Sequence, residues 1–168
     1  MRVLGISCYY HDSAVALVED GEIRFAIQEE RLSRRKHDAR FPVLAMGAAL
    51  RGCDLNIGDL DRIVFYEDAG LKLNRIWDQV LDGWPRTRAI FDEDLPRFVH
   101  HKLPLAEQLR KHFVYTGTIE HSEHHRSHAA SAFFTSPFER ALVVTLDGVG
   151  EYETASVYLG EGNRLRKI

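Results

Sequence analysis

The sequence has few cysteines, no long apolar run and no excess of positive charge, and each shortage excludes a class of protein. Its 168 residues contain two cysteines, Cys8 and Cys53, which are too few and too isolated for a disulfide framework or a zinc ribbon. We therefore expect free thiols in a reducing compartment. No apolar run approaches the ~20 residues of a membrane span, and the N-terminus has no signal-peptide layout. These features favour a cytoplasmic protein that has no membrane partner.

Acidic residues slightly outnumber basic ones, 25 against 22, and the formal net charge is −3. Such a balance gives no general affinity for nucleic acid. The content of hydrophobic residues, 45%, is enough for a core, and 28% of the residues are charged, which indicates a soluble surface. The length fits one domain, or one domain and part of another.

The order of apolar and polar segments predicts an α/β fold. Three strands open the chain, and Asp20-Gly21, between the second and the third, is a strong hairpin signal. A helix starts at Pro42, with proline at its first position. The strands are expected at 1–9, 13–19, 22–28 and 61–67, and the helices at 42–53, 71–82 and 104–113. A break at Trp84-Pro85 and a loop around Pro96 separate the last two helices. A short strand and a histidine-containing helix follow.

The opening pattern returns near the end of the chain. Ala14 lies seven residues before Gly21, and Ala155 lies seven residues before Gly162, in two segments that both read as strand, glycine turn and strand. Coincidence is the alternative, because this motif is common. We favour a duplicated domain: a mixed sheet with flanking helices that forms a ribonuclease-H-like lobe of the actin/hexokinase/Hsp70 (ASKHA) architecture.

Under this interpretation residues 1–138 form the first lobe, and residues 139–168 are the opening strands of a truncated second lobe. The chain is then a fragment of a longer protein. Its last strand is expected to leave unpaired backbone groups at a sheet edge. The exposed strands 141–168 therefore predict a tendency to form a homodimer or to exchange strands.

His124 and His128 are the strongest candidates for metal ligands. They are four residues apart in a segment that favours helix, so both imidazoles would project from one face. Asp147 could supply a third ligand, because it follows the apolar run ALVVTL and opens a glycine-rich turn, at the strand end where α/β sheets place ligand chemistry. His121 and His125 form a second pair with the same spacing. Spacing alone does not choose between the pairs.

Residues 29–40 carry two acids followed by five cations: Arg31, Arg34, Arg35, Lys36 and Arg40. A solvated surface is the ordinary explanation of such a charge run. Capture of a phosphate is the alternative, because clustered Arg and Lys side chains form charge-assisted hydrogen bonds with a polyanion. The sequence leaves both open.

Three blocks closely resemble the N-terminal part of the NodU/CmcH carbamoyltransferases: GISCYYHDSAVALVEDGEI, QEERLSRRKHDARFP and EHHRSHAASAFFTSPFERALVVTLDGVGE. Their order is that of the family, and the resemblance covers nearly the whole chain except residues 67–118. It implies a domain similar to the Kae1 tRNA-modification ATPase, joined to a C-terminal YrdC-like domain. It also implies that ATP and carbamoyl phosphate form carbamoyl adenylate, from which the carbamoyl group moves to a hydroxyl of a sugar or another small acceptor.

The resemblance also implies site residues. His124, His128 and Asp147 match the metal ligands of the family, with Fe²⁺ or Mn²⁺ as the expected ion. A further aspartate ligand of the family lies beyond residue 168, so we expect the isolated fragment to be inactive.

His11 and Lys36 match the active-site histidine and lysine of the family. We expect His11 to act as general base on the acceptor hydroxyl, and Lys36 to contact phosphate or carbonyl oxygen. The backbone N–H groups of Gly148, Val149 and Gly150 are expected to form an anion-binding nest beside the metal.

Two other functions remain open. The first is a Kae1-type transfer of threonylcarbamoyl to tRNA, against which the acidic balance and the second block argue. The other is a nucleotide-binding lobe without catalysis, and the predicted metal triad argues against it.

Overall fold

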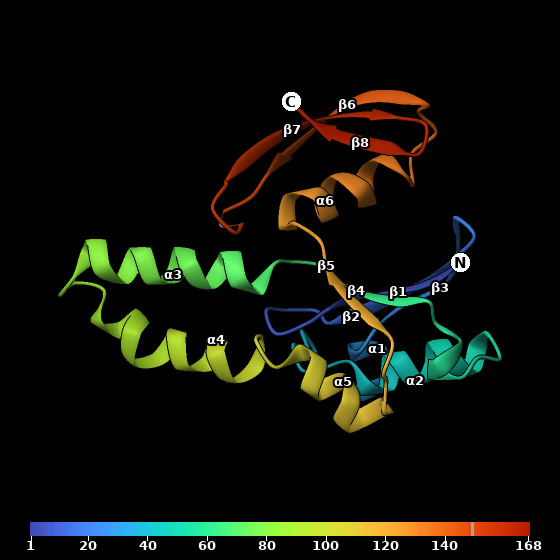
Figure 1. Ribbon diagram of the computed structural model, residues 1–168, viewed down its shortest axis with the longest axis horizontal. Helices are drawn as coiled ribbons and strands as arrows, with labels where there is room; N and C mark the ends of the chain where they lie inside the picture. The colour runs from blue at the N-terminus through green and yellow to red at the C-terminus, as the bar shows by residue number, and fades with distance from the viewer. Residues whose placement is uncertain (149) are drawn as a thin grey trace. The chain divides into compact units, whose positions relative to one another are not determined.

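The computed structural model describes residues 1–148 and 150–168 (Figure 1). The chain forms two compact units: Met1–Phe65 with Pro96–His121, and Tyr66–Leu95 with Ser122–Ile168. The predicted boundary between residues 138 and 139 remains a prediction about the longer protein. No helix in the described part of the chain has the length and apolarity that crossing a membrane requires.

The first unit is built on a five-stranded mixed sheet with the order β3-β2-β1-β4-β5. Its strands are β1 (Arg2–Ser7), β2 (Ala14–Glu19), β3 (Glu22–Gln28), β4 (Arg62–Phe65) and β5 (Thr118–His121). Strands β1 to β3 pair antiparallel, whereas β1, β4 and β5 run parallel to one another. The strands expected from the sequence are therefore confirmed, as is a mixed α/β fold with flanking helices.

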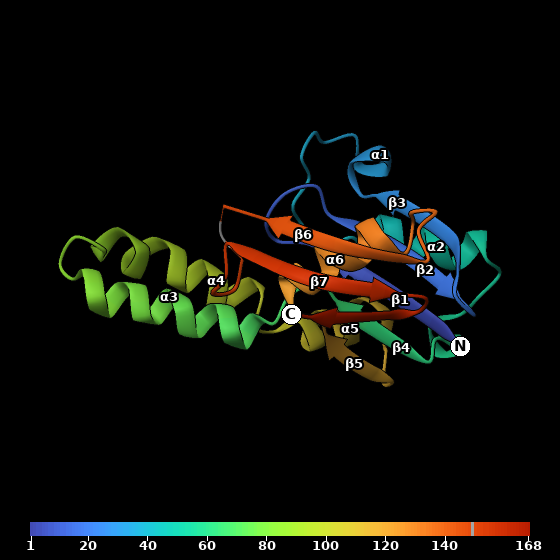
Figure 2. The same cartoon turned by 90° about the horizontal axis from the view of Figure 1, so that it is seen from above.

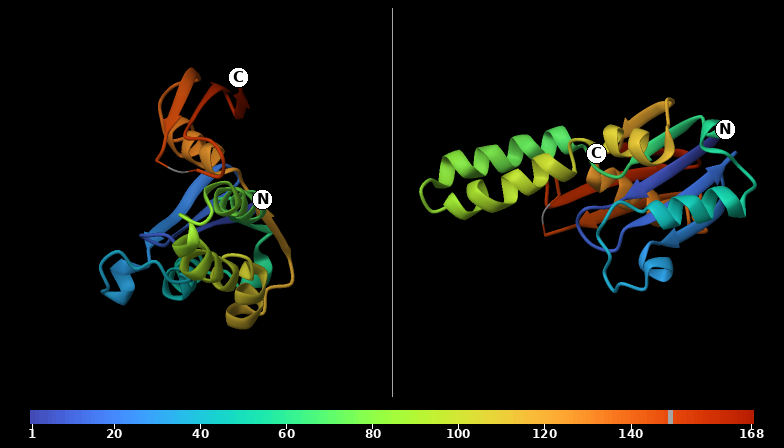
Figure 3. Two further views of the ribbon diagram at one scale, coloured as in Figure 1. Left: turned by 90° about the vertical axis from the view of Figure 1, so that its left-hand side faces the viewer. Right: turned by 90° about the horizontal axis from the view of Figure 1, so that it is seen from below.

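The core of this unit lies on one face of the sheet, where alternate residues of the strands are buried. Those of β1, β2 and β4 are Leu4, Ile6, Val15, Leu17, Ile63 and Phe65. Helices α2 (Val43–Gly52) and α5 (Leu105–Phe113) cover the same face of the sheet (Figures 1 and 3). The short elements α1 (Glu30–Ser33) and η1 (Ile57–Asp59) complete the connections.

The start of α2 depends on a residue outside the helix. Pro42 is the N-cap of α2 rather than its first residue, and it provides no side-chain cap. The buried carboxylate of Glu29 supplies the cap instead, because it accepts the backbone N–H groups of Leu44 (3.1 Å) and Ala45 (2.7 Å). An anion at this helix end is also favoured by the helix dipole.

The second unit contains a three-stranded antiparallel meander, β6 (Arg140–Leu146), β7 (Ala155–Glu161) and β8 (Arg164–Lys167), seen side by side in Figure 2. Helix α6 (His124–Phe133) packs against these strands. Gly160 permits this packing, since a Cβ there would lie 2.6 Å from the Phe133 ring. The histidine helix thus shares a core with the strands that follow it.

The region 69–101 is mostly helical, and it differs from the sequence prediction at one place, the segment around Pro96. α3 (Ala69–Gly83) is capped by Asp68 and ends before the Trp84–Pro85 break. The segment around Pro96 was expected to be a loop but is helical, with the π-helix η2 (Ile90–Asp94) followed by α4 (Leu95–His101). The π-helix runs directly into α4, so Pro96 lies inside a continuous helical segment. Proline donates no backbone N–H, and a π-helix beside it is the kind of irregularity with which helices accommodate it.

Both units contain a meander whose second hairpin turns at a glycine. Gly21 has φ = 90° and Gly162 has φ = 55°, values that glycine adopts without a steric cost. The repeated pattern in the sequence therefore corresponds to a repeated strand arrangement.

Candidate metal centre

Glu151 fixes the start of the histidine helix. Helix α6 begins at His124, and its N-cap residue Glu123 makes no side-chain cap. Glu151 accepts the backbone N–H of His124 at 3.1 Å and that of Asp68 at 2.5 Å, so one carboxylate serves the starts of both α6 and α3. Burial raises the pKa of Glu151, and the two backbone hydrogen bonds oppose this rise.

Asp147 reaches the helix from the connection between β6 and β7. It follows the last residue of β6, and its backbone N–H donates to the carbonyl of Thr154 at 2.8 Å, which closes the connection. The predicted position at a strand end is therefore confirmed.

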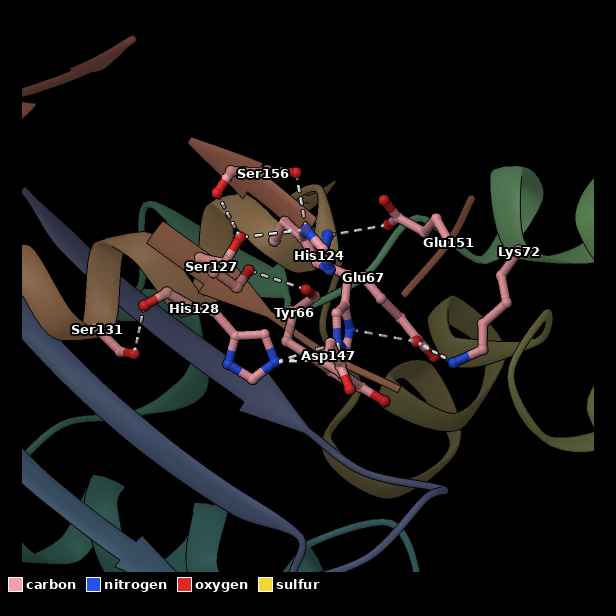
Figure 4. A network of polar contacts seen from close by, with 12 residues as sticks. Tyr66, Glu67, Lys72, His124, Ser127, His128, Ser131, Asp147, Glu151 and Ser156 are labelled. Carbon is pink, nitrogen blue, oxygen red and sulfur yellow. Dashed lines mark hydrogen bonds and ion pairs between the residues drawn. The ribbon is translucent and has the colours of Figure 1, made fainter. Parts of the chain in front are cut away.

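The side chains of His124, His128 and Asp147 converge (Figure 4). His124 Nε2 lies 2.6 Å from Asp147 Oδ2 and 3.1 Å from His128 Nε2, and His128 Nε2 lies 3.5 Å from the same carboxylate oxygen. Ligand atoms around one first-row ion are separated by roughly 3 Å, because each lies about 2.0–2.2 Å from the metal. The three atoms thus have the spacing of a ligand set.

The surroundings of His124 fit a metal ligand as well. Burial lowers the pKa of His124, which favours the neutral imidazole that binds metals, although the hydrogen bond with Asp147 opposes this effect. Its other ring nitrogen, Nδ1, is buried without a hydrogen-bond partner in residues 1–148 and 150–168, and it lies 3.9 Å from Glu67 Oε2. Glu67 is fully buried and accepts from Lys72 Nζ at 2.7 Å. A carboxylate behind the non-ligating nitrogen is the usual companion of a metal-binding histidine.

The second histidine pair does not form a site. His121 ends strand β5, whereas His125 is on α6, so the two are not on one helix face. His125 is buried, and its Nδ1 lies 2.7 Å from Ser156 Oγ. The structure thereby chooses between two pairs that spacing left open.

His11 and Lys36 belong to the first unit, on two loops that backbone hydrogen bonds join. The N–H of Tyr9 donates to the carbonyl of Ala39 at 2.7 Å, and that of Ser13 donates to the carbonyl of Asp38 at 2.8 Å. Two predicted catalytic residues from distant parts of the sequence are therefore on adjoining loops. Lys36 is exposed, and its role remains a prediction.

Asp12 holds two imidazoles on these loops. Its Oδ2 lies 2.9 Å from His11 Nδ1, and its Oδ1 lies 3.0 Å from His37 Nδ1. Because a carboxylate only accepts, Nδ1 carries the proton in both rings, and Nε2 presents a lone pair in the neutral form. The hydrogen bond from His37, followed by that from His11, holds the pKa of Asp12 below its ordinary value. Asp12 and His37 both have positive φ, which Asp and His tolerate better than most residues.

The glycine turn is only partly described. Val149 lies outside the described residues, and Gly148 has no neighbour within 4 Å of its would-be Cβ. The N–H of Gly150 donates to the carbonyl of Glu153 at 3.3 Å, so this amide closes the turn. The predicted anion nest remains a prediction.

Sequence reasoning did not find Glu29, Glu67, Glu151, Asp12 or His37 as partners. Glu29 belongs to the charged block that suggested phosphate capture, but it caps a helix. Of the cations in that block, Arg40 is paired with buried Asp38 at 2.6 Å. Phosphate binding by the other, exposed cations stays a prediction. Apart from Asp12 and its neighbour His11, these residues contact groups that are far away in the sequence, so no local signal marks them.

Known proteins resemble this chain over nearly its whole length. It matches the carbamoyltransferase N-terminus family over residues 2–168. It is 43% identical to the uncharacterized protein sll1178 of Synechocystis over 172 residues, which cover 98% of this chain and 28% of that protein. It is 30% identical to nodulation protein NolNO of Sinorhizobium fredii over 163 residues, 95% of this chain and 23% of that protein. With nodulation protein U of Rhizobium tropici the identity is 30% over 148 residues, 84% of this chain and 24% of that protein. The chain thus spans about a quarter of the length of these relatives.

Proposed function

The chain belongs to the carbamoyltransferase family, whose N-terminal domain it matches over residues 2–168, and we propose that the full-length protein is an ATP-dependent O-carbamoyltransferase. In this proposal carbamoyl phosphate is the donor, carbamoyl adenylate is the intermediate, and the acceptor is a hydroxyl of a sugar or another small molecule. The convergence of His124, His128 and Asp147 is the observation that supports it best. A transfer between anionic groups needs a cationic centre to offset phosphate charge.

We assign the sheet β3-β2-β1-β4-β5 to the first ribonuclease-H-like lobe of the ASKHA architecture, and β6 to β8 to the opening of the second lobe. The strand order and the two antiparallel meanders support this assignment. An ASKHA protein binds its nucleotide between two such lobes, which agrees with the use of ATP.

His124 and His128 would hold the divalent ion through Nε2, and Asp147 through Oδ2. Two imidazoles and a carboxylate suit Fe²⁺ or Mn²⁺, as the family resemblance implies, and they also accept other first-row ions. The bound ion supplies Lewis-acid stabilisation of the adenylate phosphate. Glu67 places a negative charge 3.9 Å behind the His124 ring, and Glu151 fixes the start of the helix that carries both histidines.

In the transfer step the acceptor oxygen bonds to the carbamoyl carbon, the bond from that carbon to the phosphate oxygen breaks, and AMP leaves. His11 takes the hydroxyl proton at Nε2, because its Nδ1 already donates to Asp12. Lys36 offers a point charge to the departing phosphate. The acceptor contacts and a YrdC-like domain that makes the adenylate belong, in this proposal, to the rest of the longer protein.

A direct assay tests the proposal. The intact protein is incubated with ATP, labelled carbamoyl phosphate, Fe²⁺ or Mn²⁺, and a panel of hydroxyl-bearing small molecules. We expect one AMP for each carbamoylated product. Parallel reactions contain threonine, bicarbonate and tRNA. Modification of tRNA alone would contradict the proposal in favour of threonylcarbamoyl transfer, and nucleotide binding without any turnover would indicate a non-catalytic lobe.

A further inference from the structure

The second unit contains a pocket of about 200 Å³ that does not include the metal-ligand side chains. Leu71 of α3 is the apolar residue of its lining. The polar residues that line it come from the start of α6, the connection between β6 and β7, and the end of β8: Glu123, His125, Glu151, Tyr152, Glu153 and Lys167. Its position and lining make it a candidate binding site.

A chain of hydrogen bonds determines which ring nitrogen of His125, a residue of this lining, carries the proton. Ser156 Oγ donates its only proton to Glu153 Oε2 at 2.6 Å, so it must accept from His125 Nδ1, which lies 2.7 Å away. Thr145 Oγ1 donates to the carbonyl of Ser156 and lies 3.2 Å from the same Nδ1. The proton of the neutral imidazole is therefore on Nδ1, and Nε2 is an acceptor.

The acceptor Nε2 has no hydrogen-bond partner among the residues that the structure describes, although His125 is only 4% exposed. The space beside it exists because residue 150 is glycine: a Cβ at Gly150 would lie 3.0 Å from Nε2. A buried acceptor without a donor is rare in folded proteins and calls for a partner.

The side-chain donors of the lining, Lys167 and Tyr152, each have an acidic partner. Lys167 Nζ donates to Glu153, and the Tyr152 hydroxyl donates to Asp78 at 2.7 Å. The lining holds three carboxylates against one ammonium, and that ammonium is paired. A ligand for this pocket must therefore bring hydrogen-bond donors and positive charge.

Anions and metal ions fit the pocket poorly. An anion would meet the carboxylates of Glu123, Glu151 and Glu153. In the described part of the chain, the groups of ligand atoms that converge within 4.8 Å are His124 with His128 and Asp147, and Asp12 with Glu30 and His37. The residues of the pocket form no such group.

We propose that this pocket binds a primary ammonium group, which donates one N–H to His125 Nε2 and is stabilised by the surrounding carboxylates. The volume suits a small amine or the amino end of a larger molecule. This site does not depend on carbamoyl transfer, so it goes beyond the function proposed above.

Binding to the intact protein, measured by calorimetry, tests the site with three probes. Ethylammonium carries charge and N–H donors, tetramethylammonium carries charge without donors, and propionate carries the opposite charge. We expect ethylammonium to bind, tetramethylammonium to bind about tenfold more weakly or not at all, and propionate not to bind. Equal binding of both cations would overturn the role of His125 Nε2.

Variants locate the binding. Gly150→Ala should abolish ethylammonium binding because its methyl group fills the space beside Nε2, whereas Gly58→Ala, in open space in the first unit, should leave it unchanged. Because Gly150→Ala also crowds the carbonyl of Glu153, Glu123→Gln is the second variant. It removes one charge from a side chain that caps no helix, and it should weaken binding about threefold or more. Unchanged binding in both Gly150→Ala and Glu123→Gln would overturn the site.

The ammonium could instead belong to a lysine elsewhere in the full-length protein. Carbodiimide treatment distinguishes the sources, since it would join such a lysine to Glu123 or Glu153 in a peptide that mass spectrometry identifies. That crosslink, together with no ethylammonium binding, would support ammonium recognition and assign its source to the protein itself. If neither a crosslink nor ethylammonium binding is observed, the proposal is overturned.

Discussion

Each unit places one aspartate between two histidines, but the two clusters differ in which nitrogen faces the carboxylate. In the second unit His124 and His128 direct Nε2 toward a single oxygen of Asp147. In the first unit His11 and His37 direct Nδ1 toward different oxygens of Asp12. The side chains of His11 and His37 are 63% and 66% exposed. In the other cluster that of His124 is 10% exposed and that of His128 is 55% exposed, and both aspartates are 30% exposed.

The difference indicates two kinds of site. Three acceptor atoms that converge on one point repel each other unless a proton or a cation lies between them, so the cluster of His124, His128 and Asp147 fits a metal ion. A carboxylate that receives one N–H from each ring is already satisfied, and it leaves Nε2 of both neutral rings as an acceptor. The exposed cluster therefore fits proton transfer or hydrogen bonding to a substrate. The following predictions test this contrast.

The largest expected effect is the loss of metal binding when a histidine of the second unit is removed, which a histidine variant in the first unit should not show. His124→Ala or His128→Ala should reduce the affinity of the intact protein for Fe²⁺ or Mn²⁺ by more than about 100-fold, because each removes a ligand. His11→Ala should keep the metal but reduce carbamoyl transfer by about 100-fold or more, as loss of a general base does. Metal content by mass spectrometry and initial rates measure the two effects.

His100→Ala is the matched control, because His100 is an exposed histidine on α4. It should change neither quantity. Full metal content in both His124→Ala and His128→Ala would show that the histidine helix is only a scaffold.

A smaller effect is expected at the carboxylate behind the metal cluster. Glu67→Gln should weaken metal binding by about tenfold, because it removes the negative charge that lies 3.9 Å from His124 Nδ1. Titration with Mn²⁺ measures the affinity, and thermal melting checks that the variant is folded. Glu107→Gln, an exposed change on α5, is the control. An unchanged affinity in folded Glu67→Gln would remove Glu67 from the site.

The smallest effect is expected at the exposed cluster. Asp12→Asn should lower kcat by roughly threefold to tenfold with an unchanged metal content, because an amide has one acceptor oxygen and can hold only one imidazole through Nδ1. Asparagine also tolerates the φ of 45° at this position. Asp54→Asn, an exposed change at a φ of 54°, is the control.

The pH dependence of this effect follows from the lowered pKa of Asp12. The hydrogen bonds from His37 and His11 lower that pKa, so the carboxylate holds both rings above its ordinary pKa of 3.8 and loses them as the pH falls through the lowered value. Asp12→Asn should therefore differ from the native protein at neutral pH. A pH–rate profile in which the variant and the native protein coincide at neutral pH would exclude a positioning role for Asp12.

The patterns in the sequence predicted the local structure well. Alternating apolar residues and the Asp20-Gly21 turn predicted the opening strands, because period and turn residues act over a few positions. The loop expected around Pro96 was wrong, since proline can also occur inside a helix beside an irregular turn, which here is the π-helix η2.

Residue type and short spacing predicted the strands and the turns, and they indicated His124, His128 and Asp147 as metal candidates. The fold was needed to choose between the two histidine pairs, to show that Glu151 caps a chain segment 83 positions away, and to place Glu67 behind His124. The physical reason is that hydrogen bonds and burial depend on distances in space. Spacing along the chain determines those distances within one helix or hairpin, but not between segments that the fold brings together.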